Sequence, residues 1–246
     1  MDRLAYLASS GAKQLLHRQD TIAHNLANAS TPGFRADLDA FRAVPVQGDG
    51  PGTRVFVTES TPAFDSSGGT LQTTGRNLDV AIEGDGFIAV EARDGGEAYT
   101  RAGSFDVGSD GSLRTRAGLA VQGEGGPITI PENSTVTIGR DGTVSAVAAG
   151  NSKSVNVVGR IKLVNPAATD LVKGGDGLFR NRDGSSAPSD PAVKVVDGTI
   201  EGSNVNIVEA MVSMIAVARQ FETQMRLMTA ADQNARDATK LLSNNG

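Results

Sequence analysis

Residues 207–242 read IVEAMVSMIAVARQFETQMRLMTAADQNARDATKLL, and this stretch decides the fold. Its apolar side chains recur at alternating steps of four and three residues, the heptad spacing that keeps one stripe of a helix facing a partner helix. The stripe consists of Ile207, Met211, Met214, Ala218, Phe221, Met225 and Met228. No Gly or Pro interrupts residues 207–243. At about 1.5 Å per residue, the pattern therefore predicts one helix roughly 50 Å long that needs a partner.

A second amphipathic stripe lies at the opposite end of the chain. Leu4, Leu15 and Ile22 lie on it, and Leu26 lies beside it. The spacing predicts a helix from about Asp2 to Ala29. We expect the two terminal helices to pair as a coiled coil, with the apolar surface left over covered by neighbouring molecules. The alternative is two ordinary helices packed on a central domain.

The segment after the first predicted helix reads NLANASTPGF over residues 25–34. Pro32 and Gly33 stop a helix, because proline lacks the N–H group and glycine favours the turn that follows. We expect Gly33 to need a positive φ, so that valine there would spoil the turn. Phe34 is interpreted either as a plug at this corner or as an ordinary core residue.

The middle of the chain contains two regions that differ in composition and in the spacing of their apolar residues. Residues 31–74 are rich in glycine and carry one short β-like run, which indicates an extended linker or arm with little core of its own. Residues 75–203 alternate short apolar runs with tight turns and show no helical period, which predicts an antiparallel β domain. Asp-Gly, which suits the positive φ angles of hairpin turns, begins at Asp85, Asp94, Asp110, Asp141, Asp176, Asp183 and Asp197.

These patterns together predict an α+β fold in three parts. Residues 1–30 and 204–246 would form the helical coiled-coil domain, residues 31–74 the linker, and residues 75–203 the β domain. The chain has 246 residues with a net charge of −5, so a broad basic surface for nucleic acid is not expected. Cysteine is absent, which excludes disulfides and thiolate metal sites. No apolar window is long enough to span a membrane, and the N-terminus lacks the features of a cleavable secretory signal.

No group of residues builds a credible active site, so no catalytic residue, metal site or cofactor is expected. Residues 84–89, GDGFIA, nearly match a dinucleotide fingerprint, but strand-like residues follow where a helix must begin, which favours a hairpin. His17 and His24 are seven residues apart, whereas a zinc helix motif needs a spacing of four. The arginines lie between acidic residues and are interpreted as solvated or interfacial: Arg35, Arg42, Arg54, Arg76, Arg101, Arg114 and Arg116.

Several segments together resemble the family of bacterial flagellar rod and hook proteins. Residues 25–35 (NLANASTPGFR) resemble the N-terminal signature of that family. The middle blocks are residues 74–82 (TGRNLDVAI), 84–87 (GDGF) and 99–105 (YTRAGSF), and the C-terminal block is residues 200–206 (IEGSNVN) with 214–215 and 219–222. The blocks arrive in the order of the family and cover most of the chain. Residues 1–3, 41–48, 97–101 and 176–180 favour the proximal-rod member, with the distal-rod member as the alternative.

The resemblance implies a structural subunit that stacks head to tail into the axial tube of the flagellar basal body, transmits torque and conducts exported subunits. Its implied partners are other copies, other rod proteins, the surrounding rings and, transiently, the flagellar type III export apparatus. The residues expected to pair helices or contact neighbours are Leu4, Leu15, Ile22, Leu26, Ile207, Met211, Met214, Phe221, Met225 and Met228. The motif and turn residues are Asn25, Leu26, Asn28, Thr31, Pro32, Gly33, Phe34, Ser203, Asn204 and Val205.

A second hypothesis comes from a different class of protein. It is a secreted enzyme or adhesin that displays the β domain on a coiled-coil stalk. That reading needs a pocket with converging polar groups, and the sequence offers no such cluster.

Overall fold

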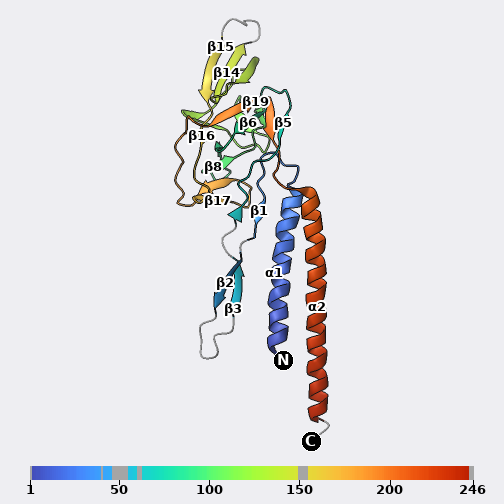
Figure 1. Cartoon of the computed structure of the whole chain (residues 1–246). Helices are drawn as coiled ribbons and strands as arrows, with labels where there is room; N and C mark the ends of the chain where they lie inside the picture. Colours follow the sequence, from blue (N-terminus) through green and yellow to red (C-terminus); the bar gives the residue numbers. More distant parts are fainter. Residues whose placement is uncertain (1, 40, 46–54, 60–62, 149–154, 244–246) are drawn as a thin grey trace. The chain divides into compact units, whose positions relative to one another are not determined.

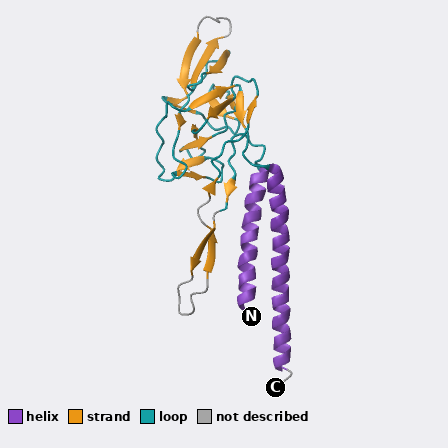
Figure 2. Cartoon of the chain, in the orientation of Figure 1, coloured by secondary structure: helices purple, strands orange, loops and turns teal. Residues whose placement is uncertain are grey.

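A computed structural model describes residues 2–39, 41–45, 55–59, 63–148 and 155–243 (Figure 1). The chain divides into two compact units, a helical unit of Met1–Ala29 with Val205–Gly246 and a β unit of Ser30–Asn204. The secondary structure confirms an α+β chain with a helix near each end and antiparallel strands between them (Figure 2). The predicted separate linker of residues 31–74 stays a prediction.

The helical unit consists of α1 (Asp2–Ala27) and α2 (Ile207–Ser243). The two helices contact each other and lie side by side in antiparallel directions, and α2 extends past the N-terminus of α1 (Figures 1 and 2). Asn206 caps α2, because its Oδ1 accepts hydrogen bonds from the N–H groups of Val208 at 3.1 Å and Glu209 at 3.3 Å. Both helices are therefore continuous where the sequence lacks helix breakers.

The β unit is built from short antiparallel strands. Their bounds are β1 Asp37–Leu38, β2 Phe41–Pro45, β3 Val55–Glu59, β4 Ala63–Phe64, β5 Leu71–Thr73, β6 Val80–Glu83, β7 Phe87–Glu91, β8 Glu97–Thr100, β9 Phe105–Val107, β10 Leu113–Thr115, β11 Gln122–Gly123, β12 Gly126–Pro127, β13 Ser134–Ile138, β14 Thr143–Ala148, β15 Val155–Arg160, β16 Leu163–Val164, β17 Leu171–Lys173, β18 Phe179–Asn181, β19 Lys194–Asp197 and β20 Thr199–Glu201. The largest sheet has five strands in the order β16-β7-β8-β18-β17, and β13-β14-β15 form a three-stranded sheet.

Two apolar clusters form the core of the β unit. The larger one includes Ile88, Phe105 and Leu113, each fully buried. The smaller one packs the rings of Phe87 and Phe64 against Phe179, with centroid distances of 5.1 and 4.7 Å. This core is made mostly of aliphatic side chains and is complete within the unit.

The Asp-Gly turns are confirmed, because all seven glycines of these pairs have a positive φ. One detail of the prediction is wrong. Gly84 and Gly86 do not close a hairpin, because β6 pairs with β19, whereas β7 pairs with β8 and β16. No helix begins at Gly86, so the dinucleotide fingerprint also lacks its structural context. The sequence of a turn predicts its backbone conformation, but the pairing of the strands depends on residues far away along the chain.

Residues 31–74 contain strands that pair both locally and with the far end of the β unit. β1 pairs with β4, and β2 pairs with β3. β5 pairs with β20, which joins this segment to the last strand of the unit. Residues 46–54, which include the glycine-rich run of the predicted linker, lie outside the described residues.

Candidate functional site

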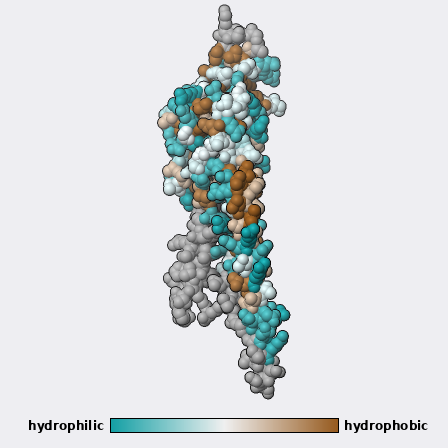
Figure 3. Space-filling model, turned by 45° about the vertical axis from the view of Figure 1, so that its right-hand side comes forward, coloured by the Kyte–Doolittle hydropathy of each residue, from teal (hydrophilic) through white to brown (hydrophobic). Residues whose placement is uncertain are grey.

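The first turns of α2 carry an apolar face that is open to solvent. Ile207, Val208, Met211, Val212 and Ile215 are between 45% and 71% exposed. Side chains at these spacings share one side of a helix. Figure 3 shows apolar side chains gathered near the start of α2. We call these five residues the open face. A contiguous apolar face of this kind usually marks a protein contact, because single soluble chains rarely expose one.

A different stripe of α2 is shielded from solvent. Met214, Phe221, Gln224 and Met228 are half-buried, and Val217, at 2% exposed, is the most buried of the α2 side chains that the structure describes. This stripe runs along the contact with α1, since the Gln224 amide lies beside Gly11, 3.4 Å from the position of a Cβ atom added there. The shielded stripe also repeats at alternating steps of three and four residues, as helix pairing requires.

Three of the six predicted contact residues of α2 lie on the shielded stripe, and the other three are exposed. Met214, Phe221 and Met228 belong to the shielded stripe. Ile207, Met211 and Met225 are 44–50% exposed, so they are not part of it. The shielded stripe passes through Val217 and Gln224, and the predicted Ala218 beside it is also half-buried, whereas Met225 is exposed.

The predicted residues of α1 are only partly placed. Leu15, Ile22 and Leu26 are half-buried, as expected for a stripe covered by one neighbouring helix. Ala12 is the most buried of the described α1 side chains, at 7% exposed. The side chain of Leu4 lies outside the described part of the chain.

The predicted turn after α1 has the geometry that the sequence indicates. Helix α1 ends at Ala27, and the Asn28 N–H donates to the carbonyls of His24 at 3.2 Å and Asn25 at 3.1 Å. Within the β unit, the Phe34 N–H donates to the Thr31 carbonyl at 3.3 Å, and Pro32 between them is half-buried. This closes the tight turn that the motif predicts.

Gly33 has a φ of 71°, which confirms the predicted positive φ. A Cβ atom at this position would lie 2.3 Å from the backbone carbon of Arg101, so no other residue fits without moving the chain. Phe34 is buried, and the Lys173 ammonium lies 3.8 Å from its ring centroid. Gly33 therefore packs against the backbone that follows β8, and Phe34 packs against Lys173 of β17.

Three charged side chains meet in the interior of the β unit, close to Gly33. Glu201 and Arg35 are each 2% exposed, and Arg101 is 6% exposed. Arg35 Nη2 lies 2.6 Å from Glu201 Oε1, and Arg101 Nη1 lies 3.1 Å from Glu201 Oε2. Burial lowers the pKa of Arg101, and the nearby charge of Arg35 lowers it further, although Glu201 opposes both effects. We call Arg35, Arg101 and Glu201 the buried ion cluster.

Asn204 binds the same region from the end of the β unit. Its Oδ1 accepts from the Ala36 N–H at 2.7 Å, and its Nδ2 donates to the carbonyls of Asp65 and Ser67, each at 3.1 Å. The Asn204 N–H donates to the Phe34 carbonyl at 3.3 Å. Ser203 and Val205 beside it are half-buried. The motif blocks around residues 33–36, 101 and 201–204 thus converge at one place, although they are far apart in the sequence.

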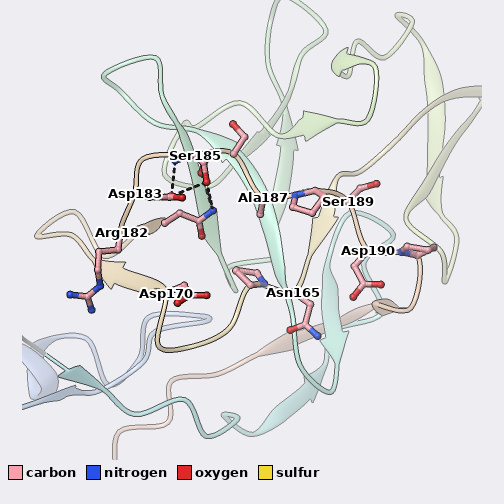
Figure 4. A pocket seen from close by; sticks show the side chains of 13 residues that line it. Asn165, Asp170, Arg182, Asp183, Ser185, Ala187, Ser189 and Asp190 are labelled. Carbon is pink, nitrogen blue, oxygen red and sulfur yellow. Dashed lines mark hydrogen bonds between the residues drawn. The ribbon is translucent and has the colours of Figure 1, made fainter.

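A cavity of about 710 Å³ lies elsewhere in the β unit, between the loops around Asn165–Asp170 and Asn181–Pro191 (Figure 4). Its carboxylates serve local turns. Asp183 accepts from the Ser185 N–H and hydroxyl, which lowers the pKa of its carboxyl group, and Asp190 accepts from the Ala192 N–H. The polar side chains of the lining do not bring together a nucleophile, a base and an oxyanion site, so the cavity lacks the arrangement of an active site.

Neither a metal centre nor a membrane-crossing helix is found among the described residues. They contain no group of His, Cys, Asp and Glu side chains that could hold a metal ion. His17 and His24 are both exposed on α1. Among the same residues, no helix is long and apolar enough to cross a membrane.

The sequence reasoning missed two features. It interpreted Arg35 and Arg101 as solvated or interfacial, and this is wrong because both are buried against Glu201. Their positions after a turn and after a buried strand were the available signal. It also missed Val208, Val212 and Ile215, which follow one another at steps of four and three along α2 and so form an apolar stripe of their own.

Three sequence families match this chain. The family described as flagella basal body rod protein matches residues 6–35, and the flagellar hook protein FlgE/F/G D1 domain matches residues 81–146. The flagellar basal body rod FlgEFG protein C-terminal family matches residues 196–241. The first and third matches fall on the predicted helices and motif blocks, and the second falls on the β unit.

Individual relatives match over the full length. The flagellar basal-body rod protein FlgF of Salmonella typhimurium is 49% identical, with 99% of each chain covered. FlgF of Escherichia coli is 48% identical with the same coverage. The flagellar basal-body rod protein FlgG of Bacillus subtilis is 33% identical, with 98% of this chain and 99% of that protein covered. From the three family matches and these full-length identities, the chain belongs to the FlgF family of flagellar basal-body rod proteins.

Proposed function

We propose that this protein is a structural subunit of the proximal rod of the flagellar basal body, and that its open face is covered by neighbouring subunits in the assembled rod. The observation that carries the proposal is the open face itself, since five neighbouring apolar side chains at the start of α2 remain exposed in the single chain. Membership of the FlgF family indicates that this assembly is the flagellar basal body. The distal rod is the alternative location, and the FlgG identity of 33% against 49% for FlgF favours the proximal one.

The helical unit would pair as a coiled coil. The shielded stripe of Met214, Val217, Phe221, Gln224 and Met228 has heptad spacing, and the half-buried Leu15, Ile22 and Leu26 of α1 have the matching period. One partner helix covers only one side of α2. The rotation between the shielded stripe and the open face leaves a second side for another molecule.

The energetics favour assembly into a multi-subunit structure over a simple dimer. Complete burial of a large apolar side chain contributes about 1.5–3 kcal/mol, so burying the half that remains exposed on five residues contributes about 5 kcal/mol. Association costs about 4–15 kcal/mol in lost freedom of motion. One such contact offsets only the lower end of this cost, whereas several contacts made at once exceed it. An exported chain would therefore stay monomeric until it reaches the growing end of the rod.

Contacts in such an assembly would be head to tail, because a closed dimer uses the same surface twice and cannot extend into a tube. Met211 lies on the open face, and Met225 is also exposed further along α2. Methionine is flexible and polarizable, so it suits a surface that meets neighbours of different sequence. Other rod proteins, the surrounding rings and the flagellar type III export apparatus are the further partners that this role implies. Torque transmission and passage of exported subunits through the tube belong to the same proposal.

The test is a pair of substitutions on exposed positions of α2. Val212→Asp adds a charge to the open face, whereas Gln220→Asp adds the same charge at an exposed polar position outside it. We expect both variants to unfold like the unmodified protein, because surface changes usually alter stability by no more than about 0.5 kcal/mol. Only the Val212→Asp protein should be missing from purified basal bodies, and cells that carry it should not swim. Normal incorporation of Val212→Asp would remove the open face from the proposal.

A further inference from the structure

The two ends of the β unit are tied together in its interior. The incoming connection, residues 30–37, carries Gly33 and Arg35, and the outgoing connection, residues 201–206, carries Glu201 and Asn204. The Gly33 N–H donates to the Glu201 carbonyl at 2.8 Å. The Glu201 carboxylate pairs with Arg35, and Asn204 binds Ala36 and Phe34 as described above. Any force that separates the two connections must first break this set of contacts.

Glu201 also anchors both connections to the sheets. Its Oε1 accepts from the Gly69 N–H at 2.9 Å, just before β5, and its Oε2 lies 3.1 Å from Arg101 Nη1, just after β8. Arg101 Nη2 in turn donates to the Gly84 carbonyl at 2.8 Å. The Glu201 carboxylate therefore joins the incoming connection to the outgoing one. Directly or through Arg101, it also holds the segment before β5 and the segments after β6 and β8.

The charge arrangement makes Glu201 the key member. Two buried arginines share a single carboxylate, and removing it would leave two buried positive charges unpaired, which is far costlier than losing a surface ion pair. Among the described residues, Arg35 Nη1 and Nη2 and Arg101 Nε make no hydrogen bond, although Arg35 Nη2 lies 2.6 Å from Glu201 Oε1 as an ion pair. An anion site does not follow from this, because Asp85 acts electrostatically on Arg101, and Lys173 pairs with Asp37 at 2.5 Å beside the Arg35 carbonyl. The nearby charges thus balance within the unit.

We propose that the buried ion cluster, with Gly33 and Asn204, is a mechanical clasp that carries tension between the two connections and the sheets of the β unit. This rests on the proposed function, because a rod subunit experiences force when torque passes along the axis. The connections are the covalent routes between the β unit and the helices. The clasp joins them at the last residue of β20, so the force is shared with the incoming connection instead of pulling on that strand from one side.

Single-molecule pulling tests this on the full chain. The chain has no cysteine, so introduced cysteines are unique attachment points. Ser30→Cys with Glu209→Cys pulls across the clasp, whereas Ser109→Cys with Ala168→Cys pulls across exposed parts of the β unit away from it. Glu201→Gln is the test substitution. Glu83→Gln is its matched control, because Glu83 makes an exposed ion pair with Arg140 in the same unit.

On the axis across the clasp, we expect Glu201→Gln to unfold on the order of a hundredfold faster when extrapolated to zero force, because one partner of a buried ion pair is lost before the barrier. On the other axis the change should be less than about tenfold, and Glu83→Gln should change neither axis. If Glu201→Gln accelerates unfolding equally on both axes, the cluster contributes only to general stability. If it accelerates unfolding on neither axis, the cluster carries no load. Either result overturns the proposal.

A second variant covers the case that Glu201→Gln does not fold. Asn204→Ala removes the bonds to Ala36, Asp65 and Ser67 without leaving a buried charge, and it should accelerate unfolding on the first axis only. Acceleration on both axes, or on neither, would contradict the clasp. Pulling on a single chain requires no assembly, so failure here is distinguishable from failure of the Val212→Asp incorporation test.

Discussion

The helical unit and the β unit satisfy their side chains in opposite ways. In the β unit, the large core residues and even the buried charges of Arg35, Arg101 and Glu201 find partners within residues 30–204. In the helical unit, Val217 is the one nearly inaccessible side chain among the described side chains of α2, and the open face is 45–71% exposed. The β unit thus buries its apolar and charged side chains within itself, whereas the helical unit leaves an apolar face exposed, which we propose neighbouring subunits cover.

This difference teaches where mutations should act. A change in the β unit should appear as a loss of stability in the isolated chain. A change on the helical unit should appear in the isolated chain only along the shielded stripe, and elsewhere only on assembly. The β unit also exposes some apolar side chains, since Val155 and Val157 of β15 are 61% and 69% exposed.

The largest expected effect separates two glycines of the β unit that have the same φ of 71°, Gly33 and Gly75. A Cβ atom at Gly75 would meet nothing within 4 Å, whereas one at Gly33 would meet the backbone of Arg101 at 2.3 Å. Gly75→Ala should cost about 1 kcal/mol for the positive φ, and Gly33→Ala about 4 kcal/mol because the backbone must also move. Urea unfolding measures both, and equal costs would show that the close approach at Gly33 is unimportant.

The next effect concerns the shielded stripe. Val217→Asp places a charge at a 2% exposed position and should cost the helical unit about 3 kcal/mol, separating α1 from α2. Val208→Asp, at 71% exposed, is the matched control and should leave the isolated chain unchanged. Far-UV circular dichroism reports the helices. Fluorescence of Tyr99 in a Tyr6→Phe background reports the β unit, since the chain has two tyrosines and no tryptophan. Simultaneous loss of both signals would contradict the independence of the units.

A smaller effect is expected from alkaline pH in the β unit. Burial raises the pKa of Tyr99 from 10.0 to about 12, and hydrogen bonding to Glu97 adds to this. The folded state therefore holds the proton more tightly, so its stabilisation is present below pH 10 and is lost as the pH rises toward 12. The loss should reach about 2 kcal/mol at pH 12. Tyr99→Phe should remove this pH dependence from urea unfolding curves, and an unchanged slope in that variant would assign the effect to another group.

The smallest effect concerns the Asp-Gly turns. Hydrogen bonds from the Thr143 hydroxyl and N–H lower the pKa of Asp141, so this stabilisation is present above about pH 4 and is lost as the pH falls. Because Asp141 is 47% exposed and screened by solvent, the loss should be only about 0.5 kcal/mol. Asp141→Asn should flatten the acid limb of the stability curve slightly, and a large change would show that the turn matters more than its exposure indicates.

Much of this molecule could be predicted from its sequence because the signals are local. The lack of Gly and Pro over residues 207–243 predicts the long helix, and the seven Asp-Gly pairs predict turns that the structure confirms. Gly33 was identified from the Pro-Gly pair that precedes Phe34. Each of these depends on backbone preferences that act within a few residues.

The errors arise where a choice depends on distant residues. Gln224 interrupts the apolar pattern of the shielded stripe, so the sequence favours the apolar but exposed Met225 next to it. Arg35 and Arg101 looked solvated because the acid that neutralises them, Glu201, is 166 positions from Arg35 and 100 from Arg101 along the chain. The pairing of β6 with β19 is equally remote. Periodicity finds an element, but it cannot find that element's partner.

The closeness of Gly33 and Glu201 has a consequence for how this chain could have arisen. A unit whose first and last residues are neighbours can be inserted into a host hairpin without disturbing it, as domain insertion requires. Residues 30–204 satisfy that condition and could be exchanged for a longer or shorter module. A lineage could thus vary the β unit while keeping the same pair of helices.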